Sequence, residues 1–170
     1  GGRRFCRRRG RRFEGARRGA AVGGLPGGWA GMNQHAILWP VLALILWTFL
    51  VLLLVPVRRF RAAFAGRVAV SDFCQGESAR VPSDVSLPNR VFMNLTEVPP
   101  LFYVVCVVYY VTATVGPLAL GLAWLYVALR LAHSLIYLGY NHVVHRFAVF
   151  AASNFVVVAM VFELALSLPR

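Results

Sequence analysis

Residues 37–57 read ILWPVLALILWTFLVLLLVPV, a continuous run without a charged side chain. A helix needs about 20 predominantly apolar residues to cross the hydrocarbon core of a bilayer, which is roughly 30 Å thick. This run is long enough and apolar enough to be a membrane span. The run ends at three arginines, Arg58, Arg59 and Arg61, and no small-residue cleavage site precedes them. We therefore do not interpret the run as a signal peptide.

Three further apolar blocks of similar length follow the first. Of the 170 residues, 59% are hydrophobic and 14% are charged, whereas a soluble domain is about half apolar and about a quarter charged. We therefore predict an all-α integral membrane four-helix bundle that forms one domain over residues 32–170. The predicted spans are residues 37–57, 90–112, 118–140 and 147–168.

The net charge of +12 is distributed unevenly. All 18 basic residues are arginines, and nine of them precede Met32. Residues 1–31 are mostly Gly, Arg and Ala, and we expect them to be disordered. They could be a polybasic arm against anionic lipid, a twin-arginine targeting signal, or sequence upstream of a true start at Met32. We favour the third interpretation, because this bias is typical of translated GC-rich non-coding DNA. The basicity therefore gives no support to a nucleic-acid partner.

Arginines also predict the orientation of the chain. The polar loop at residues 58–89 and the short link at residues 141–146 both carry Arg, whereas the turn at Gly116-Pro117 carries none. Cytoplasmic loops of membrane proteins are enriched in Lys and Arg. Both basic segments should therefore be cytoplasmic, and the bilayer itself is the first predicted partner.

Two spans carry polar side chains where lipid is expected. In the second span the polar residues are spaced by four and three, which places them on one helical face; they are Arg90, Asn94 and Glu97. In the third span the same spacing recurs at Tyr126, Arg130, His133, Tyr137 and Tyr140. Charged side chains inside a span are costly and usually face a protein interior. We expect the two stripes to converge, with Glu97 and Arg130 close enough to form an ion pair.

Two interpretations of these stripes remain open. A Glu–Arg pair can simply hold two helices together, and tyrosines at helix ends are ordinary interfacial anchors. We favour a ligand site, because joining two helices does not require so many donors at one depth. Two or three arginines with Asn, Glu and Tyr suit a small zwitterionic ligand that carries several negative charges.

Other polar residues have structural interpretations. Pro99-Pro100 removes two backbone donors and should kink the second span. Glu163 is expected either at the membrane interface or paired between helices. His142 and His145 are expected at headgroup level, and no third ligand accompanies them, so no metal site is predicted. The three cysteines show no CxxC spacing, which argues against a disulfide-exchange enzyme.

The same residues resemble two motifs of the MAPEG superfamily, the membrane-associated proteins in eicosanoid and glutathione metabolism. Residues 90–102, RVFMNLTEVPPLF, resemble the family's second-helix motif R-x-x-x-N-x-x-E-x-x-P. Residues 130–139, RLAHSLIYLG, resemble its third-helix motif R-x-x-[HY]-x-x-x-Y. Arg146 matches in position the arginine that activates the glutathione thiol in the prostaglandin-forming member. The likeness extends over about residues 35–168, with both motifs in the right order.

The resemblance implies a homotrimer of four-helix subunits that binds glutathione between adjacent subunits, on the cytoplasmic side. Arg146 would then stabilise the thiolate, which is the nucleophile, for attack on a lipophilic electrophile or peroxide. The activity that the resemblance implies is therefore that of a glutathione-dependent transferase or peroxidase. By the same resemblance, the residues that hold glutathione would be Arg90, Asn94, Glu97, Arg130, His133 and Tyr137.

The chain also departs from the family pattern. Phe147 and Phe150 stand where the eukaryotic synthases place a hydroxyl residue and often a tyrosine, and Leu87 replaces a further arginine. The short chain is typical of the bacterial branch, which implies a bacterial inner membrane and a thiol that need not be glutathione. A non-catalytic MAPEG-fold binding protein is therefore the alternative. A small multidrug transporter is disfavoured. Transporters of that class have a buried Glu in the first span, whereas the first span of this chain has no charged residue.

Overall fold

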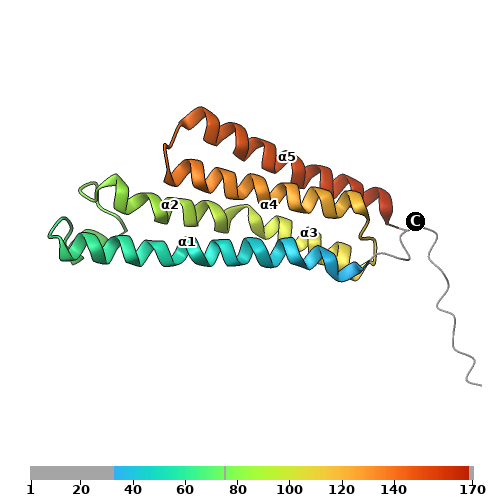
Figure 1. Ribbon diagram of the computed structural model, residues 1–170, viewed down its shortest axis with the longest axis horizontal. Helices are drawn as coiled ribbons and strands as arrows, with labels where there is room; N and C mark the ends of the chain where they lie inside the picture. The colour runs from blue at the N-terminus through green and yellow to red at the C-terminus, as the bar shows by residue number, and fades with distance from the viewer. Residues whose placement is uncertain (1–32, 75, 169–170) are drawn as a thin grey trace, which may run out of the picture.

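The computed structural model of the protein describes residues 33–74 and 76–168, and these form a bundle of long helices (Figure 1). The predictions for residues 1–31 lie outside the described residues. Over the described ranges every named element is helical, which confirms the all-α prediction. The elements are η1 (Gln34–Ile37), α1 (Leu38–Phe64), η2 (Val70–Phe73), α2 (Ser83–Glu97), α3 (Pro99–Val111), α4 (Pro117–Leu138) and α5 (Val143–Ser167).

The bundle contains four helical segments long and apolar enough to cross a membrane, as predicted. They are Gln34–Phe64, Ser83–Val111, Pro117–Leu138 and Val143–Ser167. Large apolar side chains such as Leu46, Phe49 and Phe162 are exposed on their outer surfaces. Contiguous apolar surface of this kind marks a membrane or protein interaction site.

Helix α1 is longer than a span requires, because its 27 residues extend about 40 Å at 1.5 Å per residue. It ends where Gly66 adopts a φ of 67°, a left-handed conformation that glycine reaches without a Cβ penalty. The Gly66 N–H donates to the Ala63 carbonyl and the Arg67 N–H to the Ala62 carbonyl, each at 2.9 Å. These bonds satisfy the last carbonyls of α1 and turn the chain toward α2.

The second span consists of two helices, which confirms the predicted kink. Helix α2 ends at Glu97 and α3 begins at Pro99, with Val98 between them. Pro99 and Pro100 have no backbone N–H, so the helical hydrogen-bond ladder is interrupted at this point.

Helices α4 and α5 form an antiparallel pair that lies along one side of α1, α2 and α3 (Figure 1). Pro117 occupies the first turn of α4, where its missing donor has no cost. Between α4 and α5, Asn141 turns the chain with a φ of 49°, which Asn tolerates better than most residues. The contact between α4 and α5 is the most extensive in the bundle, so the polar face of α4 has α5 as its main neighbour.

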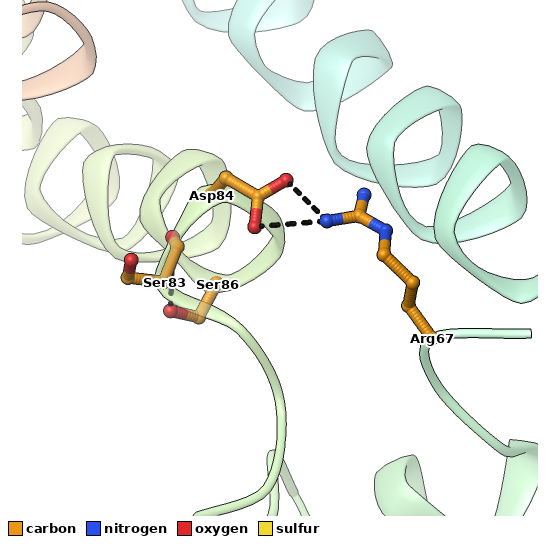
Figure 2. A network of polar contacts seen from close by, with 4 residues as sticks. All are labelled: Arg67, Ser83, Asp84 and Ser86. Carbon is orange, nitrogen blue, oxygen red and sulfur yellow. Dashed lines mark hydrogen bonds and ion pairs between the residues drawn. The ribbon is translucent and has the colours of Figure 1, made fainter. Parts of the chain in front are cut away.

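Ion pairs stabilise the end of the bundle that holds the α1–α2 loop. Arg67, just beyond α1, donates to both carboxylate oxygens of Asp84, at 3.1 and 3.3 Å (Figure 2). Asp84 lies in the first turn of α2, where a negative charge also interacts favourably with the helix dipole. Two further pairs join Arg59 to Glu77 at 2.8 Å and Arg80 to Asp72 at 3.4 Å.

Asp72 organises the loop itself. Its carboxylate accepts hydrogen bonds from the Ala69 backbone N–H at 2.9 Å and from the Ser78 hydroxyl at 3.0 Å. These two hydrogen bonds, with a smaller contribution from the Arg80 charge, hold the pKa of Asp72 below its usual value. The loop is therefore built around an ionised carboxylate.

Candidate functional site

The polar stripe of α4 centres on Arg130, whose side chain is fully buried inside a span. Its Nε donates to the Tyr126 hydroxyl at 3.0 Å, and its Nη2 donates to Asn154 Oδ1 of α5 at 3.1 Å. The guanidinium also lies over the rings of Tyr126 and Phe150, at 5.3 and 5.1 Å from their centroids. In the part of the chain that the structure describes, no carboxylate pairs with Arg130, and its buried Nη1 has no hydrogen-bond partner.

His133 lies one helical turn further along the same face and is 3% exposed. Its Nδ1 is 3.1 Å from the Arg146 carbonyl oxygen. Because a carbonyl can only accept, a neutral imidazole here carries its proton on Nδ1 and offers the Nε2 lone pair. Nε2 is buried and unpartnered among the described residues. Arg130 and His133 thus each present one unused nitrogen on the same side of α4.

Arg146 lies near the start of α5 and is half-buried. Its Nη1 donates to Asn141 Oδ1 at 2.8 Å, and its Cζ lies 4.0 Å from the centroid of the Tyr137 ring. Tyr137 belongs to α4 and is itself buried. The structure therefore brings together four of the predicted site residues along the α4–α5 contact: Arg130, His133, Tyr137 and Arg146.

The charge of this cluster is unbalanced. It contains two arginines, and the ion pairs among the described residues all lie elsewhere, between the α1–α2 loop and its neighbours. A buried charge without a partner is costly, particularly within a bilayer. An arrangement of this kind can bind an anionic group, because such a group supplies both the missing charge and the missing hydrogen-bond acceptor.

The polar stripe of α2 lies elsewhere, and the expected ion pair between Glu97 and Arg130 does not form within one chain. Arg90 and Glu97 are exposed, and the Asn94 amide donates to the Arg90 carbonyl at 2.8 Å. The expectation that both stripes converge inside a single bundle is wrong, because Arg130 of α4 is directed to Asn154 of α5. Three of the predicted site residues are thus on an outer face of the protomer.

Glu163 takes the second of its two predicted alternatives, since it contacts a neighbouring helix. The Tyr109 hydroxyl of α3 contacts the Glu163 carboxylate of α5 and lies 2.7 Å from the Met160 carbonyl oxygen. His142 and His145 are exposed at the other end of α5, with ring centroids 4.4 Å apart. In residues 33–74 and 76–168, no group of three His, Cys, Asp or Glu side chains is arranged to hold a metal ion.

The structure adds two residues that the motifs did not identify, Phe150 and Asn154. Phe150 contacts the Arg130 guanidinium and lies 5.6 Å from the His133 ring, centroid to centroid. A signal was available in the sequence, because Arg146, Phe150 and Asn154 follow one another at intervals of four and share a helical face.

A separate groove of about 340 Å³ lies beside the proline break, between α1 and α2–α3. It is lined mainly by apolar side chains, among them Phe49, Leu95 and Tyr103. Its α2 residues lie on the opposite side of that helix from Arg90 and Glu97. The groove is therefore suited to an apolar group and is distinct from the polar cluster.

Comparison with protein-family models identifies a match to the MAPEG family over residues 37–166. No curated protein and no solved structure matches the chain significantly. The matched region includes the polar cluster of α4 and α5 and the exposed stripe of α2.

Proposed function

The chain belongs to the MAPEG family of integral membrane proteins, and on this premise we propose that it is a membrane-bound glutathione-dependent transferase or peroxidase that acts on lipophilic electrophiles. The family is associated with glutathione and eicosanoid metabolism. One observation carries the proposal: Arg130 is buried inside a span without an acidic partner among the described residues, and its Nη1 is unused. A cation in this state favours an anionic ligand, which would supply the missing opposite charge.

Glutathione matches the chemistry of the cluster. It has two carboxylates, an ammonium group and a thiol. Arg130 would bind a carboxylate and Arg146 the thiolate, and the free Nε2 of His133 would accept a hydrogen bond from an amide. Tyr137, which is stacked against Arg146, would hold that guanidinium in place.

The exposed stripe of α2 supports assembly of several copies of the chain, and we propose the homotrimer that the family resemblance implies. Arg90 and Glu97 are exposed on a helix that is long enough to span the membrane. A charge facing hydrocarbon costs about 2.5–3.5 kcal/mol even on insertion-based scales. A second copy of the chain that covers this stripe would remove the cost. Arg90, Asn94 and Glu97 would then complete the site between adjacent subunits, with Glu97 receiving the ammonium group of the ligand.

Arg146 is the proposed catalytic residue. A nearby cation and a helix N-terminus both lower the pKa of a thiol, and the thiolate is the reactive form. The thiol would lose its proton to solvent, and Arg146 would stabilise the resulting anion. The sulfur would then form a bond to the electrophilic carbon while the leaving group departs with the electron pair of the bond that breaks.

The arginines support a cytoplasmic site, in the bacterial inner membrane that the family resemblance implies. At the end of the bundle that holds the α1–α2 loop and the α4–α5 link, the chain carries Arg58, Arg59, Arg61, Arg67, Arg80 and Arg146. The described residues at the opposite end carry none. By the positive-inside rule the arginine-rich end, and with it Arg146, faces the cytoplasm, where small thiols are abundant.

A non-catalytic MAPEG-fold binding protein is the second candidate, and one observation favours it. The Arg146 guanidinium is already engaged by Asn141 and Tyr137. The flanking Phe147 and Phe150 supply no hydroxyl group that could assist it. Such a protein would bind the tripeptide without ionising its thiol.

A titration of the purified protein with glutathione distinguishes these candidates. The ultraviolet absorbance of thiolate reports ionisation, and calorimetry reports binding. We expect both signals in the wild type, binding without thiolate in Arg146→Ala, and wild-type behaviour in Arg61→Ala, which removes an exposed arginine of α1 that forms no ion pair among the described residues. Binding without thiolate in the wild type would favour the second candidate, and the absence of both signals would refute both.

A further inference from the structure

Asn154 is the α5 residue that accepts a side-chain hydrogen bond from Arg130, and it does so without a charge. Its Oδ1 accepts from Nη2 at 3.1 Å, across the α4–α5 contact. Nothing in the family motifs requires a polar residue at this position, which lies within the apolar fourth span. A half-buried amide in such a segment needs a physical reason.

We propose that Asn154 is a positioning residue that holds the Arg130 guanidinium through an uncharged acceptor, so that the positive charge stays available for an anionic group of the bound ligand. The identity of that ligand, a glutathione-type peptide, rests on the proposed function. Asn154 itself does not have to touch the ligand.

The geometry explains how one amide can set the direction of a guanidinium. The group is planar, and its N–H donors point in fixed directions. Tyr126 holds the Nε edge at 3.0 Å and Asn154 holds Nη2 at 3.1 Å. The guanidinium also lies over the rings of Tyr126 and Phe150, which limits its movement. With two donors held in this way, the direction of the unused Nη1 is set by the planar geometry of the group.

The chemistry explains why an amide is better suited than a carboxylate. An aspartate at this position would accept the same hydrogen bond more strongly, because charge-assisted bonds are shorter and stronger than neutral ones. It would also neutralise Arg130 and compete with an incoming carboxylate. An apolar side chain would leave a second guanidinium nitrogen without a partner. Asn154 meets the geometric requirement while keeping the charge.

The depth of the contact between Asn154 and Arg130 supports a role for this pair that is separate from that of Arg146. Asn154 follows Arg146 by eight residues, which is about 12 Å along α5. The cluster therefore has an outer arginine near the start of α5 and an inner arginine held by Asn154. An anionic ligand that spans several ångströms can use both.

The test compares Asn154→Asp, Asn154→Ala and wild type in lipid nanodiscs. The probe is S-methyl glutathione, which keeps both carboxylates but cannot form a thiolate. Calorimetry measures its binding, and thermal unfolding measures stability in the same preparation. Ser153→Ala is the matched control, because the Ser153 hydroxyl donates only to the Phe150 carbonyl of its own helix, at 2.7 Å.

We expect Asn154→Asp to unfold at the wild-type temperature or above it and to bind the probe at least about tenfold more weakly, since one hydrogen bond to a charged group corresponds to that factor or more. If the role of Asn154 were purely structural, the opposite pattern would be expected, in which probe binding weakens only when the unfolding temperature falls. Wild-type binding by Asn154→Asp would overturn the positioning role and leave the proposed function intact. Absence of binding in the wild type would instead refute the proposed function. Asn154→Asp decides the question even if Asn154→Ala does not fold.

Discussion

The Arg146 guanidinium of α5 lies over the ring of Tyr137 of α4, with its Cζ 4.0 Å from the ring centroid. The same guanidinium donates to Asn141 at 2.8 Å. A cation placed over an aromatic face is attracted to the ring, typically by about 0.5–2 kcal/mol depending on solvation. The proposed catalytic arginine therefore also joins the two helices that form the polar cluster.

Replacement of Arg146 by Lys should separate the charge of this residue from its geometry. Lysine keeps the positive charge but cannot reproduce the planar guanidinium fork. We expect thiolate absorbance to be reduced in Arg146→Lys and absent in Arg146→Ala, while binding of S-methyl glutathione stays within about tenfold of wild type in both. Equal thiolate signals in Arg146→Ala and the wild type would contradict the proposed role.

Glu97 should be required for assembly, because it is exposed on α2 in the single chain. We expect Glu97→Ala to shift the proposed trimer toward smaller species in native mass spectrometry and to weaken glutathione binding in calorimetry. Thr96→Ala is the control, since the neighbouring Thr96 is also exposed and its hydroxyl bonds only to backbone carbonyls of α2. A stable trimer with unchanged binding in Glu97→Ala would contradict both roles, because neither assembly nor the ligand site would then depend on Glu97.

The sequence predicted the helices better than it predicted their partners. The apolar runs determine the four spans, and Pro99-Pro100 determines the break between α2 and α3, because both depend on local chemistry. The spacing of Arg130, His133 and Tyr137 places them on one face of α4, but it cannot say which neighbour that face meets. Chain order suggested α2, whereas packing selected α5, so Asn154 was not anticipated.

The loop around Asp72 should loosen in acid. Its hydrogen bonds lower the pKa of Asp72 in the folded protein, whereas an unfolded Asp titrates near about 3.9. A lowered folded-state pKa stabilises the loop above the unfolded value, and this contribution is lost as the pH falls through the folded value. We expect the protection factors of the amides in residues 68–74 and 76–80, which correct exchange for its intrinsic pH dependence, to be constant from neutral pH to about pH 5 and to fall below about pH 4.

Asp72→Asn provides the control for this pH dependence. It leaves the Arg80 partner without a charge to pair with and cannot titrate. At matched pH, the variant should exchange faster than wild type at neutrality, and the difference should shrink in acid. If the difference in exchange between Asp72→Asn and the wild type stays constant over the whole pH range, the stability of the loop does not come from the ionised carboxylate.

Replacement of Arg130 by Met should separate the stability of the bundle from its ligand binding. Arg130 is fully buried, and its Nη1 has no partner among the described residues, so the folded chain carries an uncompensated polar group inside a span. Replacing a whole buried ion pair by apolar groups of similar volume is often neutral or stabilising, and Arg130→Met likewise leaves no charged partner behind, only the uncharged Tyr126 hydroxyl and Asn154 amide. We therefore expect the melting temperature of Arg130→Met to equal or exceed that of the wild type in the absence of ligand. Binding of S-methyl glutathione should fall by about a hundredfold, since an interaction of about 3 kcal/mol with a charged group is lost.

Leu129→Met is a suitable control for the added methionine, because Leu129 is a neighbouring, partly buried residue of the apolar core. A large loss of stability in Arg130→Met, with binding reduced only in proportion, would mean that Arg130 is retained to hold α4 against α5. A stable variant that cannot bind would mean that the bundle does not need Arg130 for its stability and contains this buried cation to bind the ligand.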